Sequence, residues 1–361
     1  MEAPGSGAPP LNVADYERLA AEALDPGAHG YFAGGAGDER TLRENVSAFA
    51  RWRLRQRVLV DVSDVNTRTT VLGEPLTMPI LVAPVAFQRL AHPDGEAGMA
   101  RAAAAAGTVM CLSTLATASP SEVVAAAPGA RLWFQLYCFR DRGVTRALLS
   151  EAVEAGFRAV ALTVDAPRPG RRERDLRSGF RLPAELRVPG VAKATGAEGA
   201  PISVAEVLGL VDPALDWTDL EALVSDSSLP VLVKGVMTAE DAVLAADRGA
   251  AGVIVSNHGG RQLDGVAATV DAVAEVAQAV GDRVEVLMDG GVRRGSDVLT
   301  ALALGARAVL VGRPAVWGLA VAGEDGAGRV LELLRDELEL ALALCGCPGP
   351  EAVSRAHVQR S

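Results

Sequence analysis

The chain has few of the residues that mark disulfide-rich, metal-binding and membrane-spanning proteins. Its 361 residues include only four cysteines, Cys111, Cys138, Cys345 and Cys347. They are too few and too scattered for a disulfide framework, and the last two have neither the spacing nor the partners of a zinc site. No apolar run approaches the roughly 18 residues of a transmembrane helix. We therefore expect a cytoplasmic protein without a metal site or a membrane partner.

Positive charge is also scarce. Lysine and arginine number 35 against 45 acidic residues, which gives a formal net charge of −10. Nucleic acid is therefore excluded as the main partner, because phosphate backbones require a basic surface. A small anionic substrate stays compatible with this charge, since one local arginine cluster can bind it. The hydrophobic content of 49% is ample for a core.

Short apolar runs recur along the chain, and Ala-rich amphipathic segments such as 94–107 and 238–250 separate them. The runs occupy residues 79–84, 108–113, 131–137, 159–165, 230–235, 252–257, 284–291 and 308–313. Nearly continuous apolar strands are typical of a parallel sheet that is covered on both faces. Strand and helix in eightfold alternation predict an α/β fold, the (β/α)8 TIM barrel. A doubly wound open sheet is the alternative, but no G-x-G-x-x-G follows the first strand.

The domain organisation follows from these runs. Residues 1–10 resemble no signal peptide, and we expect them to be a disordered lead. Residues 11–78 predict an N-terminal helical cap, and residues 79–361 the barrel. The fourth strand-to-helix connection is much longer than the others, which predicts an insert or lid at about 170–215. A helix within 212–226 should then lead into the fifth strand.

Polar residues gather where the predicted strands end, at the face that carries the active site in TIM barrels. Every strand but the first ends in such residues: Ser113, Gln135, Tyr137, Thr163, Asp165, Lys234, Ser256, Asn257, His258, Asp289, Gly290, Gly291, Gly312 and Arg313. Phosphate usually binds after the last two strands of this fold. There, glycines would let backbone N–H groups approach an anion, and Arg293 and Arg313 add charge. The alternative is that these glycines only make tight turns.

Three residue types in these loops suggest chemistry. His258 is the best candidate for a general base, because an imidazole titrates near neutral pH, and Asp165 could orient it. Arg261 and the pair Arg171 and Arg172 have the planar guanidinium that grips a carboxylate. Lys234 could form a Schiff base, place a fixed charge beside a cofactor, or only extend its amine to solvent.

Six segments of the chain are similar to those of a known family. They are SNHGGRQLDG, LVKGV, ALTVDAPRPGRRERD, WFQLY, APVAFQRLAHPDGE and DGGVRRGSDVLTALALGARAVLVGRP. In this order they resemble the FMN-dependent α-hydroxy acid oxidases, which include glycolate, lactate and hydroxymandelate oxidases. The resemblance extends over nearly the whole chain from about residue 11.

The resemblance implies an FMN site and a role for each of its residues. The residues that it places against FMN are Ala83, Pro84, Val85, Ala86, Ser113, Gln135, Thr163, Lys234, Ser256, Asp289, Gly291, Arg293, Gly312 and Arg313. Ser113, Gln135 and Thr163 would bond the flavin ring. Lys234 would stabilise the charge of the reduced flavin, and the last five residues would hold the ribityl phosphate.

The resemblance also implies the reaction. Arg172 and Arg261 would bind the carboxylate of an (S)-2-hydroxy acid, with help from the hydroxyls of Tyr31 and Tyr137. His258 would take the substrate proton with Asp165 stabilising the imidazolium, and O2 would reoxidise the flavin to give H2O2. Leu115 stands where glycolate oxidase has a tryptophan, so the choice between lactate- or glycolate-like and mandelate-like substrates stays open. The family is commonly homotetrameric.

Three other readings of the sequence stay open. The first is a quinone-linked dehydrogenase, although Ala86, where mandelate dehydrogenase has glycine, favours oxygen. The second is an aldolase that works through a Schiff base on Lys234, with the phosphate loops binding a sugar phosphate. The third is a barrel that binds flavin or phosphate without catalysis.

Overall fold

Eight parallel strands close into a barrel in the computed structural model, which describes residues 9–183, 185–196, 207 and 209–361. The strands are β4 (Ile80–Val82), β5 (Val109–Ser113), β6 (Arg131–Leu136), β7 (Ala159–Thr163), β8 (Val231–Val236), β9 (Gly252–Val255), β10 (Glu285–Asp289) and β11 (Ala308–Val311). Each pairs with its neighbours along the chain, and β11 returns to β4. The prediction of a (β/α)8 barrel is therefore confirmed.

The barrel strands are apolar on both faces because both faces are buried. Leu81, Trp133 and Leu287 belong to a cluster inside the barrel, whereas alternate residues such as Ile80 and Phe134 pack against the outer helices. This alternation follows from the two-residue repeat of a strand. The interior is apolar in its lower layers and becomes polar at the carboxyl ends of the strands.

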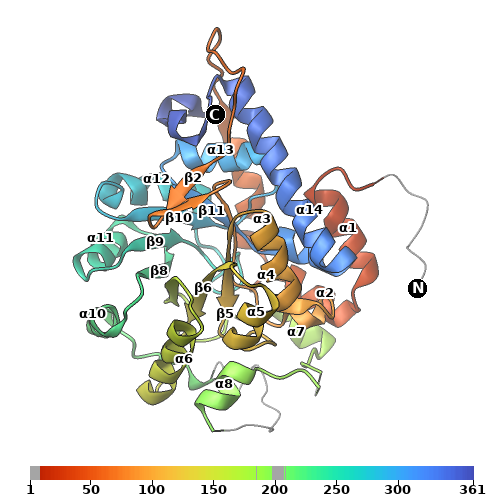
Figure 1. Ribbon diagram of the computed structural model, residues 1–361, viewed down its shortest axis with the longest axis vertical. Coiled ribbons are helices and arrows are strands. Elements are labelled where there is room, and N and C mark those ends of the chain that lie inside the picture. Colours follow the sequence, from red (N-terminus) through yellow and green to blue (C-terminus); the bar gives the residue numbers. More distant parts are fainter. Residues whose placement is uncertain (1–8, 184, 197–206, 208) are drawn as a thin grey trace.

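Helices surround the barrel (Figure 1). They are α4 (Gly95–Ala105), α5 (Pro120–Ala126), α6 (Arg142–Glu154), α10 (Trp217–Asp226), α11 (Ala239–Asp247), α12 (Thr269–Val280), α13 (Gly295–Ala303) and α14 (Arg313–Cys345). Side chains cap several N-termini as their sequences favour: Ser119 and Asp216 form capping boxes before α5 and α10. The long helix α14 bends at Ala322 and Gly323, whose backbone angles are not helical.

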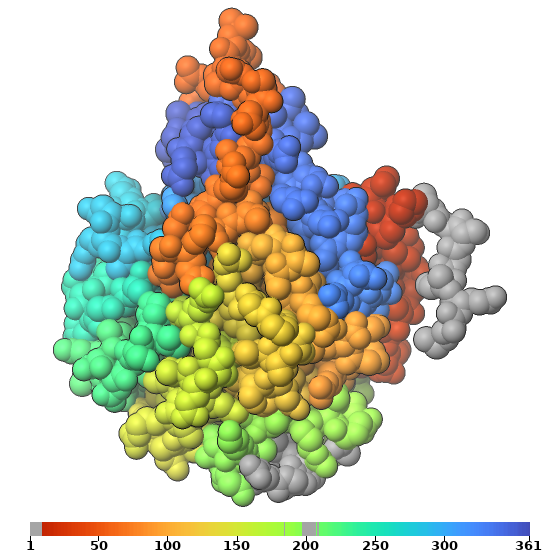
Figure 2. All heavy atoms as spheres, viewed as in Figure 1, coloured from red at the N-terminus to blue at the C-terminus, as the bar shows by residue number. Residues whose placement is uncertain are grey.

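The residues before the barrel form a helical part and a strand part. The helical part holds α1 (Val13–Ala23), α2 (Pro26–Ala33), α3 (Arg40–Ser47) and the 3-10 helix η1 (Ala48–Arg51), and α1 packs on α14. Strand β1 (Trp52–Leu54) then pairs with β12 (Val358–Arg360), which follows the short helices η3 (Pro350–Ala352) and η4 (Arg355–His357). After β1 the chain projects as an arm that stands out from the body in Figure 2, and Leu59 of this arm is fully exposed.

A hairpin closes the lower end of the barrel. Strands β2 (Thr69–Val71) and β3 (Glu74–Leu76) pair antiparallel, and Val71 and Leu76 pack into the same cluster as the inward-facing barrel residues. The backbone N–H of Leu72 in the turn donates to the Glu285 carboxylate at 2.9 Å, which fastens the hairpin to β10. The hairpin therefore fills the end of the barrel opposite the polar layer.

The long fourth connection contains the short helices α7 (Glu173–Ser178) and α8 (Pro189–Ala194) before α10. Residues 184, 197–206 and 208 of the predicted insert lie outside the described residues, as do residues 1–8 of the predicted lead. No helix in the described ranges combines the length and apolar character needed to cross a bilayer.

Candidate active site

A cavity opens at the carboxyl ends of the strands, the face at which TIM barrels bind their ligands. It brings together nearly all the residues that the sequence singled out, although they come from every part of the chain. The predicted residues that line it are Tyr31, Ala83, Pro84, Val85, Ala86, Ser113, Leu115, Gln135, Tyr137, Thr163, Arg172, Lys234, His258, Arg261, Asp289, Gly290, Gly291, Arg293, Gly312 and Arg313. Asp165, Arg171, Ser256 and Asn257 do not line it, but Asp165 and Ser256 are each bonded to a residue that does.

Lys234 occupies the centre of the polar layer. Its Nζ lies 2.8 Å from Oδ2 of Asp289 and donates to the Ser256 hydroxyl, also at 2.8 Å. Burial lowers the pKa of Lys234, but the carboxylates of Asp289 and Asp165 outweigh it and raise the pKa above its ordinary value. Lys234 is therefore a fixed positive charge, and two of its three N–H donors already have partners.

A buried amide connects the ends of three neighbouring strands. The Nε2 of Gln135 donates to the Thr163 hydroxyl at 3.0 Å, and its Oε1 accepts from the Thr114 backbone at 3.1 Å and the Ser113 hydroxyl at 3.3 Å. Because these three bonds place donors at Oε1 and an acceptor at Nε2, the orientation of the amide is determined. Gln135, Ser113 and Thr163 thus present a preorganised polar edge to the cavity.

Partly buried arginines line the part of the cavity next to β10 and β11. Arg313 donates to the carbonyls of Phe32 at 2.9 Å, Gly34 at 2.8 Å and Gly259 at 3.0 Å. Arg293 donates to the Val292 carbonyl. Neither guanidinium forms an ion pair with any described residue, and burial lowers the pKa of both, reinforced for Arg313 by Arg261 and Arg293. Partly buried cations without an ion-pair partner favour an anionic ligand here.

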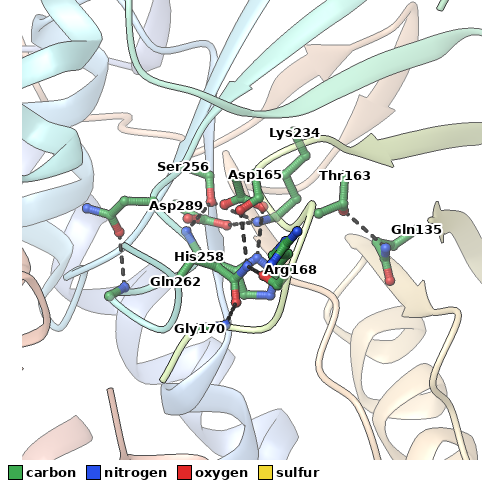
Figure 3. Close-up of polar contacts among 12 residues, drawn as sticks. Gln135, Thr163, Asp165, Arg168, Gly170, Lys234, Ser256, His258, Gln262 and Asp289 are labelled. Atoms are coloured by element: carbon green, nitrogen blue, oxygen red, sulfur yellow. Dashed lines mark hydrogen bonds and ion pairs between the residues drawn. The ribbon is translucent and has the colours of Figure 1, made fainter. Parts of the chain in front are cut away.

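His258 and Asp165 form the predicted pair. Nδ1 of His258 lies 3.0 Å from Oδ1 of Asp165, and both lie close to Lys234 in Figure 3. Burial would raise the pKa of Asp165, but His258 and Lys234 lower it below its ordinary value, so Asp165 is ionised. With Nδ1–H directed at this carboxylate, Nε2 is the basic nitrogen.

The backbone helps to aim the His258 ring. His258 has φ of 57°, a left-handed conformation that few residues other than glycine adopt. Its N–H donates to the Ser256 hydroxyl at 3.1 Å, the same hydroxyl that accepts from Lys234. The two glycines that follow, also at positive φ, allow the chain to turn sharply here. The sharp turn therefore explains the two glycines of the segment SNHGGRQLDG.

Two guanidiniums approach the ring of Tyr31. The Cζ atom of Arg261 lies 4.9 Å from the ring centroid and that of Arg172 lies 5.8 Å from it. Arg261 also donates to the Tyr31 carbonyl at 2.6 Å. Burial and then the charge of Arg172 lower the pKa of Arg261 to about 10, so a bound carboxylate would relieve this repulsion. The Nε of Arg172 is buried and has no hydrogen-bond partner in the described structure.

Tyr137 and Arg171 differ in their placement. Burial and then the Asp165 charge raise the pKa of Tyr137, so its hydroxyl stays protonated and can donate. The side chain of Arg171 is 78% exposed and lies 3.8 Å from Glu173, so Arg172 alone of this pair reaches the cavity.

Some residues of the cavity wall were not identified from the sequence. They are Phe32, Val292, Leu310, Val311, Pro314 and Val316. Each lies within three residues of a predicted one along the chain, which is the only signal that could have found them, because nothing distinguishes these apolar residues from those of the core.

The fold and the cavity together define the class of the protein. A closed parallel barrel whose strand ends carry an imidazole–carboxylate pair, a buried ammonium and an arginine-lined anion site is an enzyme of the cofactor-binding TIM-barrel class. Residues 20–360 match the family model described as FMN-dependent dehydrogenase. The chain belongs to this family, which makes it an oxidoreductase with FMN as its cofactor.

Several known proteins are similar to this one over almost the whole chain. It is 51% identical to "Glycolate oxidase 3" of Arabidopsis thaliana over 355 residues, which cover 96% of this chain and 95% of that protein. It is 50% identical to "L-lactate oxidase" of Nostoc sp. (strain PCC 7120 / SAG 25.82 / UTEX 2576) over 348 residues, with 94% and 95% covered. A mandelate oxidase structure with (S)-4-hydroxymandelic acid is 42% identical, has a TM-score of 0.90, and overlaps 97% of this chain and 98% of its own.

The residues present fit FMN. Arg293 and Arg313 have no ion-pair partner among the described residues, and the FMN phosphate would supply one. Oδ1 of Asp289 is buried without a hydrogen-bond donor, and a hydroxyl of the ribityl chain has the chemistry to satisfy it. The polar edge of Gln135 and the charge of Lys234 suit the polar side of a flavin ring.

Proposed function

We propose that the protein oxidises (S)-2-hydroxy acids to 2-oxo acids and that O2 reoxidises its cofactor, giving H2O2. The observation that carries the proposal is the convergence of His258, Arg172 and Arg261 on the cavity that also holds Lys234 and the arginine-lined anion site. The relatives named for oxidation of glycolate, lactate and mandelate support it.

The protein's own groups have separate tasks in this reaction. Arg172 and Arg261 bind the substrate carboxylate, and the hydroxyls of Tyr31 and Tyr137 assist. His258 accepts the substrate proton at Nε2, and the ionised Asp165 stabilises the imidazolium that results. FMN, when bound, supplies the two-electron acceptor.

We assign the cofactor contacts as the resemblance implies. Ala83, Pro84, Val85 and Ala86 would lie against the ring, and Ser113, Gln135 and Thr163 would bond its polar edge. Lys234, held by Ser256, would face the part of the ring that becomes anionic on reduction. Asp289, Gly291, Arg293, Gly312 and Arg313 would hold the ribityl phosphate. Arg313 has spare donors for this, because a guanidinium has five N–H groups and only three contact the backbone.

The Schiff-base alternative at Lys234 finds no support in this geometry. An imine requires a neutral amine, whereas the Asp289 and Asp165 carboxylates raise the pKa of Lys234. A quinone acceptor in place of O2 is decided by the experiment below. The substrate side chain, aliphatic or aromatic, is decided there as well.

The test is anaerobic mixing of the purified protein with glycolate, (S)-lactate, (S)-mandelate and longer 2-hydroxy acids, followed by flavin absorbance. We expect bleaching by at least one substrate and its reversal by O2 with formation of H2O2. If the flavin absorbance recovers with a quinone but not with O2, the protein is a quinone-linked dehydrogenase and not an oxidase. Loss of a positioned base costs about 10²–10⁴ in rate, so the His258→Ala variant should bind FMN yet lose most reduction. Unchanged reduction in this variant would overturn the assignment of the base.

Location and assembly complete the proposal. We expect a cytoplasmic homotetramer, as the composition and the resemblance imply. Analytical ultracentrifugation of the FMN-loaded protein measures the assembly, and a monomer at micromolar concentration would contradict it.

A further inference from the structure

The two arginines assigned to the substrate carboxylate stand on two different segments. Arg172 ends the segment 165–172, which begins with Asp165, and Arg261 belongs to the turn that begins with His258. The distance between the arginines therefore depends on how these two segments are held together.

The segment 165–172 has little to hold it in place by itself. It contains no helix or strand, and Pro167 and Pro169 have no N–H to donate. The segment is anchored at its start by β7. Near its end, the Arg171 carbonyl accepts a hydrogen bond from the Gly37 backbone N–H at 2.9 Å. Between these points another part of the chain must satisfy the backbone.

One side chain does so. The Nε2 of Gln262 donates to the carbonyls of Asp165 at 3.1 Å and Arg168 at 3.0 Å, and its Oε1 accepts from the Gly170 N–H at 3.0 Å. Both donors and the acceptor of the amide are thus used on one segment. Figure 3 shows Gln262 between His258 and the segment that carries Arg168 and Gly170.

The two segments also touch backbone to backbone. A Cβ atom on Gly170 would lie 2.2 Å from the Arg261 carbonyl oxygen and 2.7 Å from Cα of Gln262. Glycine is therefore required for the close approach that lets the amide reach its three partners. Gln262 itself is not among the residues that line the cavity.

We propose that Gln262 is a positioning residue that sets the separation of Arg172 and Arg261 and so the affinity of the site for the substrate carboxylate. The proposal rests on the proposed function, because it concerns the binding of a 2-hydroxy acid. Gln262, one position after Arg261, would thus affect substrate binding only through Arg172 and Arg261.

The Gln262→Met variant tests it, because methionine keeps the length of the side chain and removes all three hydrogen bonds. A misplacement of about 1 Å in a site of this kind can cost about 100-fold, so we expect KM for the hydroxy acid to rise at least about 10-fold. The Kd for its 2-oxo acid, read from the flavin spectrum, should rise in parallel. The Kd for FMN and the Tm should stay near wild type, and most of kcat should return at saturating substrate. The exposed Gln278→Met is the matched control and should change nothing.

A double-mutant cycle separates positioning from a general loss of structure. If Gln262 acts through Arg172, the effect of Gln262→Met on KM should shrink in an Arg172→Lys background. An unchanged KM in Gln262→Met, a rise that accompanies an equal loss of FMN affinity, or the same factor in both backgrounds would overturn the proposal. Failure of the proposed function is distinct, since the wild type would then not bleach with any hydroxy acid.

Discussion

Nδ1 of His258 lies 3.0 Å from Oδ1 of Asp165, a residue 93 positions earlier in the chain. The pair exists because β7 and β9 end on the two sides of β8, so the residues just past their ends meet over Lys234. The carboxylate fixes which ring nitrogen carries the proton and leaves Nε2 free for the proposed role as base.

The Asp165→Asn variant should therefore lose catalysis and keep its cofactor. An amide cannot stabilise the imidazolium, and loss of an orienting carboxylate of this kind costs up to about 10⁴ in kcat. We expect flavin reduction to slow at least about 100-fold, with FMN affinity within a few-fold of wild type. Stopped-flow absorbance measures the first and fluorescence titration the second. Rapid reduction in the variant would show that Asp165 has no part in the proton transfer.

The same variant should change the acid stability of the protein. The pKa of Asp165 is lower in the folded protein than its ordinary value of 3.8. Its ionisation therefore stabilises the fold above that ordinary value, and this contribution is lost as the pH falls through the lowered pKa. The fall in Tm on acidification from pH 5 to pH 3 should be smaller in Asp165→Asn. An equal fall would contradict the lowered pKa.

Lys234→Met should destabilise the protein, because it leaves Asp289 charged and buried without its partner. Breaking a buried ion pair in this way costs about 3–5 kcal/mol in the free energy of unfolding. The Lys234→Met/Asp289→Asn double variant should recover part of this loss. Denaturant titration of the cofactor-free protein at pH 8 gives the values, and a single variant as stable as wild type would contradict the ion pair.

The penalty of Lys234→Met should also depend on pH in the alkaline range. The pKa of Lys234 is raised above 10.5 in the folded protein. The Lys234–Asp289 ion pair therefore contributes fully to the free energy of unfolding below pH 10.5. This contribution is lost as the pH rises through the higher pKa of the folded state. The difference in unfolding free energy between wild type and variant should shrink above pH 10.5, relative to pH 8.

Much of this site could be predicted from the sequence because its parts are local. Each barrel strand is a short apolar run, and the residues that follow a run must reach the same end of the barrel, so His258, Lys234 and Arg313 were expected together. The pair Arg171 and Arg172 was a candidate from the residues alone, but the choice of Arg172 came from the resemblance, since the long connection that carries the pair has no periodic pattern.

Other features depend on contacts between distant segments and left no mark in the sequence. Nothing in the residues around Gln262 indicates that its amide holds the segment after β7. Arg313 was expected only to bind phosphate, yet it also bonds the carbonyls of Phe32, Gly34 and Gly259. The β2–β3 hairpin was missed because its two strands have only three residues each, too short for an alternating pattern.

Leu115 should set the size of the accepted side chain. It lines the cavity and is 4% exposed, so a larger residue there must take space from the substrate. We expect Leu115→Trp to lower kcat/KM for (S)-mandelate at least about 10-fold, in the range that pocket shape controls, and to spare glycolate. Leu115→Met, of similar volume, should leave the ratio of the two unchanged. Equal losses for both substrates would mean that Leu115 does not face the side chain.

Gly291 joins the anion site to the N-terminal cap, and it leaves no room for a side chain. A Cβ atom there would lie 1.9 Å from the Asn45 carbonyl oxygen, and φ is 84°. Since Asn45 is buried and its amide is bonded to Asn257 at 2.8 Å, it cannot retreat without disturbing the His258 turn.

Gly291→Ala should therefore weaken FMN binding and lower the Tm together. The matched control is Gly328→Ala in helix α14, where a Cβ meets nothing within 4 Å. Alanine is favoured over glycine in a helix by about 1 kcal/mol, so the control should keep its FMN affinity and gain slightly in Tm. Fluorescence titration of flavin and thermal unfolding of both variants measure the contrast. Wild-type FMN affinity in Gly291→Ala would show that the turn after β10 can open without cost to the cofactor site.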